Sequence, residues 1–192
     1  MNVGCIPSKA LLRIAKAKHT MEERALLMEL DSGGNKAKLL KPFSKINAHI
    51  EHIREKNSRN LFAGIDIIVE HATFVDGHTI QAGNKQVTAK RIFICTGTKP
   101  MVPKIKGLQE TPYLTTDTFF DLNDLPASMI ILGAGATGVE MSQALARLGV
   151  KCYLVHADPH IIAQGDPQAA QFLASVLSQE NVEIYNQQTV LE

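Results

Sequence analysis

The residue best suited to redox chemistry is Cys5, which lies near the start of the sequence in the stretch MNVGCIPSKALL. Pro7 suits the first turn of a helix, so we expect Cys5 just before a helix begins. The partial positive charge of a helix N-terminus favours a thiolate, and Lys9, one turn further on, adds a second positive influence. A lone cysteine is more often a small inert apolar residue, so the residues around Cys5 must decide between the two interpretations.

A second candidate site is the segment Gly133-Ala134-Gly135-Ala136-Thr137-Gly138, which fits the pattern G-x-G-x-x-G. It follows an apolar strand and opens a helix, which is the context typical of dinucleotide binding. The first glycine permits a tight turn, the second lets the backbone approach a pyrophosphate, and the third lets helix and strand pack closely. The amide groups at the helix N-terminus then face the phosphates. The alternative is a glycine-rich turn without a ligand.

The residue type at the end of the next strand indicates whether the coenzyme is NAD or NADP. In this sequence the segment is Val155-His156-Ala157-Asp158. An acidic residue there would bind the ribose hydroxyls of NAD, whereas an arginine would favour NADP. His156 occupies the expected position and is neither, while Asp158 lies slightly beyond it. Arginine is absent from residues 148–192, which favours NAD. A surface histidine without a cofactor role is the competing interpretation.

The spacing of apolar residues changes along the chain, and it predicts the helices and strands that position these candidate residues. A first helix from Pro7 and a second from Pro42 to Gly64 carry apolar residues at helical spacing. Short strands separated by turn pairs follow, and a proline-rich connector covers residues 98–128. The remainder alternates as β-α-β-α-β, which predicts parallel strands. The expected strands are 65–69, 74–75, 79–80, 86–87, 91–95, 129–132, 151–155 and 182–185, and the later helices are 138–148 and 168–179.

Composition excludes several classes of partner. The 192 residues carry a formal net charge of +1, which gives no electrostatic reason to expect nucleic acid or a membrane surface. No apolar run reaches the length of a transmembrane helix, and the N-terminus does not resemble a signal peptide. The seven histidines show no metal-binding spacing, and three distant cysteines argue against a disulfide framework. We therefore expect a cytoplasmic protein without a metal.

GCIPSKALL closely resembles the second half of the redox motif GGTC-x-N-x-GC-x-P-[ST]-K of the class I pyridine nucleotide-disulfide oxidoreductases. This family includes mercuric reductase, dihydrolipoyl dehydrogenase and glutathione reductase. RIFICTGTKPMVPKIKGL resembles the family's strand that ends in A-T-G, with Cys95 in place of the alanine. GAGATGVE resembles its nicotinamide-site loop. The resemblance covers essentially the whole chain.

The resemblance implies an α/β fold in two parts. Residues 1–118 would form a partial FAD-binding domain of helices and a small antiparallel sheet. Residues 119–192 would form a partial Rossmann-type NAD(P)-binding βαβαβ domain. By the same resemblance, Cys5 is the thiol next to the flavin, able to form a charge-transfer complex as a thiolate, and Lys9 lies near flavin N5. Glu140 pairs with Lys9 beside the nicotinamide.

Further contacts are implied with the cofactors. Thr96 and Gly97 line the FAD site, and the backbone of Ala72 contacts its adenine part. The alternative without a cofactor role is that Glu140 is an exposed charge on a helix. For Thr96 and Gly97 it is that they form a turn that ends a strand. If Lys9 and Glu140 have the implied roles, their side-chain tips lie within a few ångströms of each other or of a shared flavin.

The family's reaction is a relay in which NAD(P)H gives hydride to FAD, the flavin reduces a cysteine pair, and the dithiol reduces a small-molecule disulfide or a metal ion. The resemblance also implies missing parts: the first FAD-binding βαβ unit, the partner cysteine, a later FAD segment and the C-terminal domain of the family's homodimer. We therefore expect a fragment that lacks both ends. Two alternatives are a nucleotide-binding module without redox activity and an inactive truncated remnant.

Overall fold

The computed structural model describes residues 5–28, 43–44, 46–48, 51–52 and 64–191. The chain divides into two compact units, one formed by residues 1–53 with 102–192 and the other by residues 54–101. This division follows packing alone. The expected boundary between an FAD-binding part at 1–118 and an NAD(P)-binding part at 119–192 stays a prediction.

The larger unit contains a parallel sheet of three strands in the order β4 (Ser128–Leu132), β5 (Lys151–Val155) and β6 (Val182–Tyr185). Helix α3 (Ala136–Arg147) connects β4 to β5, and helix α4 (Pro167–Gln179) connects β5 to β6. Apolar side chains alternate along β5, with Cys152 and Leu154 fully buried. This is the β-α-β-α-β alternation that the sequence predicted.

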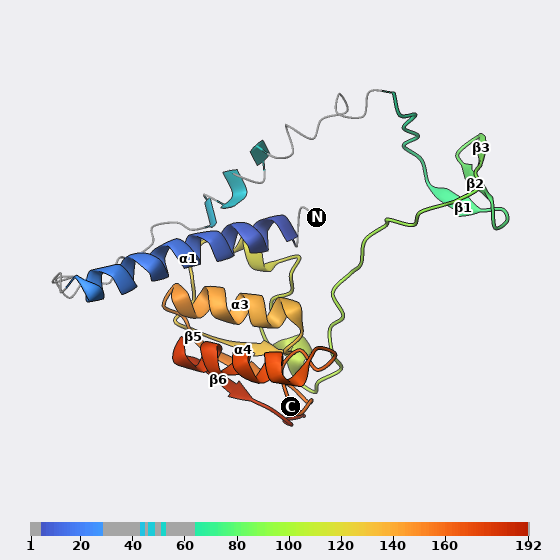
Figure 1. Ribbon diagram of the computed structural model, residues 1–192. Helices are drawn as coiled ribbons and strands as arrows, with labels where there is room; N and C mark the ends of the chain where they lie inside the picture. Colours follow the sequence, from blue (N-terminus) through green and yellow to red (C-terminus); the bar gives the residue numbers. More distant parts are fainter. Residues whose placement is uncertain (1–4, 29–42, 45, 49–50, 53–63, 192) are drawn as a thin grey trace. The chain divides into compact units, whose positions relative to one another are not determined.

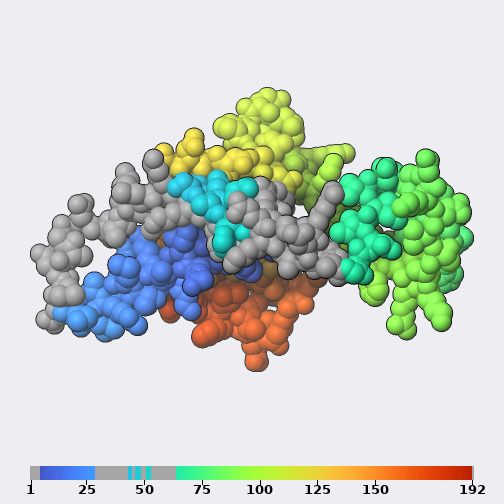
Figure 2. Space-filling view, turned by 90° about the horizontal axis from the view of Figure 1, so that it is seen from above, coloured from blue at the N-terminus to red at the C-terminus, as the bar shows by residue number. Residues whose placement is uncertain are grey.

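Helix α1 (Cys5–Leu27) packs on α3, and α3 packs on β5, so α3 lies between α1 and the sheet (Figure 1). Leu11 and Ala15 of α1 are completely buried, because residues four apart share one face of a helix. The far end of α1 is different. Leu26 and Leu27 are more than 80% exposed, and this end of the helix lies at the surface in Figure 2.

Three phenylalanine rings extend the core of this unit. Phe119 lies edge-on to Phe43 and to Phe120, with ring centroids 5.6 and 5.0 Å apart. Phe119 and Phe120 come from the short 3-10 helix η3 (Phe119–Asp121), which follows a second short one, η2 (Leu108–Glu110). Residues 43–44, 46–48 and 51–52 are helical, in agreement with the helix expected from Pro42, whose other residues lie outside the described ones.

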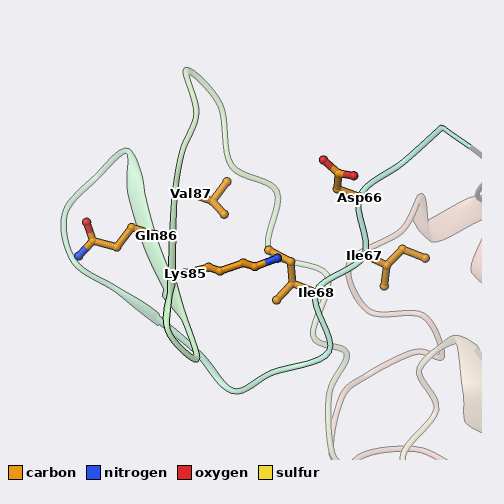
Figure 3. Close-up of a pocket in the computed structure, with 6 residues that line it drawn as sticks. All are labelled: Asp66, Ile67, Ile68, Lys85, Gln86 and Val87. Atoms are coloured by element: carbon orange, nitrogen blue, oxygen red, sulfur yellow. The ribbon is translucent and has the colours of Figure 1, made fainter.

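The smaller unit is built on an antiparallel meander of β1 (Ala72–Phe74), β2 (Thr79–Ala82) and β3 (Lys85–Thr88). Ala82 pairs with Lys85 across the two-residue turn that the sequence predicted at Gly83-Asn84. An open hollow lies between β3 and the segment 66–68, and it is lined by Asp66, Ile67, Ile68, Lys85, Gln86 and Val87 (Figure 3).

The predictions of two strands in this unit are wrong. Residues 65–69 and 91–95 have no strand pairing, although their β-branched composition favours strands. Val69 is 72% exposed and Phe93 is 82% exposed, so these apolar side chains do not pack in a core. An extended segment becomes a strand only when its backbone groups have a neighbouring strand to bind, and no described segment pairs with these two.

Candidate functional site

The centre of the candidate site is an ion pair between residues 131 positions apart. The Lys9 ammonium donates to Glu140 Oε1 at 2.5 Å. Lys9 lies on the second turn of α1 and Glu140 on the second turn of α3. The proximity expected for these two side chains is therefore confirmed. Their roles beside a flavin and a nicotinamide stay predictions.

The pair lies at the accessible edge of the contact between the two helices. The side chains of Lys9 and Glu140 are 60% and 34% exposed. Below them, Leu11 of α1 and Leu145 of α3 are fully buried in the same core. The apolar core therefore holds the helices together, while the charged pair stays open to solvent and to a ligand.

Cys5 is the first residue of α1 and is exposed. Its backbone carbonyl accepts a hydrogen bond from the Ser8 hydroxyl at 3.2 Å, which fixes the first turn of the helix. Since residues four apart share a helix face, the Cys5 thiol lies on the side of α1 that carries Lys9. The predicted role requires an accessible sulfur, and the exposure of Cys5 meets that requirement.

Cys152 shows the opposite environment. It is fully buried in β5, and burial raises the pKa of its thiol from 9.0 to about 11. Its Sγ donates a weak hydrogen bond to the Val150 carbonyl at 3.5 Å. A buried, protonated thiol is a poor nucleophile, so Cys152 is a core residue.

The glycine-rich loop has the geometry expected of two of its glycines. Gly133 has φ +98°, a conformation that residues with a side chain rarely adopt, and its amide donates to the Val155 carbonyl at 2.8 Å. A Cβ on Gly138 would lie 1.9 Å from the Gly133 carbonyl oxygen. The predicted tight turn is therefore confirmed. The third glycine permits close packing, but the tightest contact is with the loop carbonyl rather than with the strand.

Gly135 differs because a Cβ added to it would meet no heavy atom within 4 Å. It is the N-cap of α3, and no side chain caps the helix there. Glycine has no side chain that could accept from the first amide groups of α3, and the space beside Gly135 is open among the described residues. Both features fit a pyrophosphate at the helix N-terminus.

The segment after β5 lies against this loop, because the Ile162 amide donates to the Ala134 carbonyl at 2.8 Å. His156 begins the segment and is only 6% exposed. Its Nε2 lies 2.7 Å from Asn186 Oδ1, just beyond the end of β6. No sequence pattern indicated a role for Asn186. The coenzyme-binding role of His156 stays a prediction, and its ring is already engaged with a neighbouring strand end.

The remaining predicted residues belong to the smaller unit. Ala72 is the exposed first residue of β1. Thr96 and Gly97 are exposed in a segment without regular secondary structure, where Gly97 has φ +76°. Their FAD contacts stay predictions.

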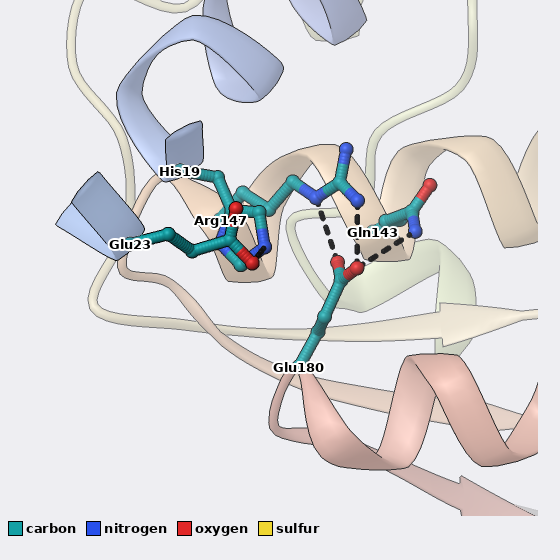
Figure 4. A network of polar contacts seen from close by, with 5 residues as sticks. All are labelled: His19, Glu23, Gln143, Arg147 and Glu180. Atoms are coloured by element: carbon teal, nitrogen blue, oxygen red, sulfur yellow. Dashed lines mark hydrogen bonds and ion pairs between the residues drawn. The ribbon is translucent and has the colours of Figure 1, made fainter. Parts of the chain in front are cut away.

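Sequence reasoning missed a group of polar contacts at the other end of α3. The Arg147 guanidinium donates to both carboxylate oxygens of Glu180, at 2.6 and 2.7 Å, and the Gln143 amide donates to the same carboxylate (Figure 4). The Lys18 ammonium donates to the Arg147 carbonyl at 3.0 Å. One signal was available: Lys18 continues the spacing of the apolar residues Leu11 and Ala15.

Among the described residues, no group of three or more His, Cys, Asp or Glu side chains is arranged to hold a metal ion. Within the same residues, no helix is both long and apolar enough to cross a membrane.

The sequence is similar to known pyridine nucleotide-disulfide oxidoreductases and mercuric reductases over most of its length. The probable pyridine nucleotide-disulfide oxidoreductase RclA of Escherichia coli strain K12 is 30% identical over 191 residues, which are 96% of this chain and 39% of that protein. A mercuric reductase of Lysinibacillus sphaericus is 26% identical over 186 residues, 96% of this chain and 34% of its own length. The chain thus spans about a third to two fifths of these relatives.

A solved structure shares the fold. The HOCl-induced flavoprotein disulfide reductase RclA from Escherichia coli superposes with a TM-score of 0.72 at 28% identity, over 98% of this chain and 40% of that one. The sequence also matches the family described as pyridine nucleotide-disulphide oxidoreductase over residues 1–192, its whole length. The glycine loop, the helix that carries Cys5 and this match lead to one assignment: the chain belongs to the pyridine nucleotide-disulphide oxidoreductase family.

Proposed function

We propose that this chain is part of an FAD-dependent NAD(P)H oxidoreductase that reduces a disulfide or mercuric ion. The observation that carries the proposal is the Lys9–Glu140 ion pair, which joins the helix that carries Cys5 to the helix that the glycine loop opens. This pair brings the redox cysteine and the coenzyme loop to one place. The relatives named as mercuric reductase and flavoprotein disulfide reductase support the two substrate classes.

Each group in the site has a defined task in this proposal. The backbone at Gly135 and the first amides of α3 bind the coenzyme pyrophosphate, since the space there is open and uncapped. Lys9 places a positive charge where negative charge develops as electrons arrive, and Glu140 orients that ammonium. A flavin held beside Lys9 would supply hydride acceptance and the electron pair that reduces a disulfide formed at Cys5.

Cys5 carries the thiol side of the reaction. As a thiolate it attacks a disulfide sulfur, which forms a mixed disulfide and releases the other sulfur as a thiolate, or it binds a soft metal ion. Its exposure at the start of α1 allows access to both. Reduction of a disulfide by a dithiol needs a second thiol. Cys95 is also exposed, and it belongs to the other compact unit. We place the protein in a reducing cytoplasm, where its thiols stay reduced.

The test is anaerobic reduction of the purified chain after incubation with FAD. Protein-bound flavin absorbance that bleaches on addition of NADH or NADPH is the expected result. Lys9→Met and Glu140→Gln should each slow bleaching at least tenfold. Lys16→Met is the matched control and should bleach at the parent rate, because Lys16 is an exposed lysine of the same helix about two turns beyond Lys9.

The same experiment distinguishes the alternative of a coenzyme-binding module without redox activity. That alternative has some structural support, because the glycine loop lies in the larger compact unit and the predicted FAD contacts at Ala72, Thr96 and Gly97 lie in the other. Colourless protein that still binds NADH would favour the module. Protein that binds neither cofactor would contradict both proposals.

A further inference from the structure

Lys18 occupies a position where an apolar side chain would be expected. Leu11 and Ala15 form the fully buried stripe of α1, and Lys18 follows at the next helical interval. Its side chain is only 10% exposed. Burial of a charged ammonium is unfavourable unless the group is bonded, so the bonds that Lys18 makes must account for a lysine at this position.

Those bonds are made to the end of α3. The Lys18 ammonium donates to the Arg147 carbonyl at 3.0 Å and to Glu22 Oε1 at 2.6 Å. Arg147 is the last residue of α3, and the last carbonyl groups of a helix have no partner within it. A cation there satisfies one such carbonyl and interacts favourably with the negative end of the helix dipole. Glu22 offsets the remaining charge.

The end of α3 is itself fixed. The Arg147 side chain forms a two-pronged bond to Glu180, the C-cap residue of α4. The side chains of Arg147 and Glu180 are only 16% and 10% exposed, so this bond is well shielded from solvent. The residue whose carbonyl Lys18 contacts is therefore tied to α4 through its own side chain, as Figure 4 shows for Arg147 and Glu180.

Two polar contacts thus join α1 to α3, one toward each end of α3. From Lys9 to Lys18 is about 13 Å along α1, and from Glu140 to Arg147 about 10 Å along α3, at roughly 1.5 Å per residue. Both positions advance in the same direction, so the helices run parallel. A stiff helix held at two points and packed between them cannot slide or roll freely.

We infer that Lys18 is a positioning residue, which anchors α1 on the C-terminal end of α3 and so holds Lys9 against Glu140. Its meaning for catalysis rests on the proposed function, because it acts through the Lys9–Glu140 pair. Without the anchor, α1 keeps its apolar contact through Leu11 and Ala15 but can shift in register. A shift of one residue moves Lys9 by roughly 1.5 Å, which lengthens the 2.5 Å contact and lowers the share of chains in which the two groups touch.

The test is a zero-length carbodiimide cross-link, which joins a lysine amine to a carboxylate only when the two are in contact. The Lys9–Glu140 amide is quantified by peptide mass spectrometry. The pair Lys151–Glu183, 3.5 Å apart on the sheet and away from α1, serves as an internal reference in the same sample. The ratio of the two cross-links reports the placement of α1 rather than the amount of folded protein.

We expect Lys18→Met to lower this ratio at least threefold. Lys18→Arg keeps a cation at the Arg147 carbonyl and should restore it, and Lys16→Met, on the exposed side of α1, should leave it unchanged. A parent-like ratio in Lys18→Met would overturn the inference. If Lys18→Met lowers both cross-links, the milder Lys18→Gln is measured instead, and the same ratio decides.

The readout does not depend on a cofactor. A chain that fails to bind flavin would contradict the proposed function and leave the cross-link ratio interpretable. In flavin-loaded protein, Lys18→Met should slow flavin reduction several-fold while the affinity for NADH stays constant, since the glycine loop is untouched. A change in affinity alone would contradict a role that acts through Lys9.

Discussion

Two substitutions in the glycine-rich loop should separate folding from coenzyme binding. A methyl group at Gly138 would lie 1.9 Å from the Gly133 carbonyl oxygen, about 1.1 Å inside the 3.0 Å limit for such contacts. The start of α3 must move away from the loop by about that distance. Overpacking of this kind costs about 1–3 kcal/mol, so Gly138→Ala should lower the free energy of unfolding by that amount.

Gly135→Ala should behave in the opposite way. Its added methyl group meets no heavy atom within 4 Å, and its φ of −71° suits alanine. The free energy of unfolding should therefore change by less than about 1 kcal/mol. The methyl group would occupy the space proposed for the pyrophosphate. Loss of even one hydrogen bond to a charged group, about 1.5–3 kcal/mol, weakens NADH binding more than tenfold.

The assay pairs urea unfolding, followed by far-UV circular dichroism, with NADH titration followed by the coenzyme's fluorescence. Gly77→Ala is the matched control, because Gly77 also has open space around its Cβ position but lies in the other compact unit. It should change neither measurement. If Gly135→Ala binds NADH like the parent chain, the loop does not hold the pyrophosphate. If Gly138→Ala unfolds like the parent chain, the close contact does not constrain the loop.

Three more outcomes follow from individual contacts. Arg147→Met removes the shielded ion pair with Glu180 and should lower the free energy of unfolding in urea by about 3 kcal/mol. Arg147→Lys should recover little of this loss, because a lysine cannot bind both carboxylate oxygens. A loss below about 0.5 kcal/mol in Arg147→Met would contradict the reasoning. Burial raises the pKa of Cys152 to about 11, so as the pH rises the thiol loses its proton in the unfolded chain before it does so in the folded one. The free energy of unfolding should therefore fall between pH 9 and 11, by at most about 2.7 kcal/mol more than in Cys152→Ala. Iodoacetamide should alkylate Cys5 and Cys95 in the folded chain and reach Cys152 only after denaturation, as peptide mass spectrometry would show.

Local sequence patterns predicted the larger unit well. The alternation of apolar strands with helices placed β4, α3, β5, α4 and β6 within one or two residues of their observed bounds. These elements satisfy their own propensities and also find neighbours along the chain, since β4, β5 and β6 pair in sequence order. Local and tertiary requirements therefore agree.

The same reasoning failed where a strand needed a distant partner. Residues 65–69 and 91–95 have strand composition, but no described segment pairs with them. Composition reports that a residue suits a pleated surface, and it does not report whether a neighbouring strand is present. The meander β1–β2–β3 formed because its strands are joined by short turns and supply partners to one another, although β1 spans Ala72–Phe74 rather than the expected 74–75.

The sequence alone determined the local chemistry: a cysteine one turn before a lysine, and glycines spaced for a tight turn, an open approach and a close contact. These properties depend on residues within a few positions of one another, so spacing specifies them. Only the tertiary structure brought Lys9 to Glu140, closed Arg147 on Glu180 and buried Lys18 against the end of α3. Such contacts join residues tens or hundreds of positions apart, and the register of one helix on another, rather than any local pattern, decides which side chains meet.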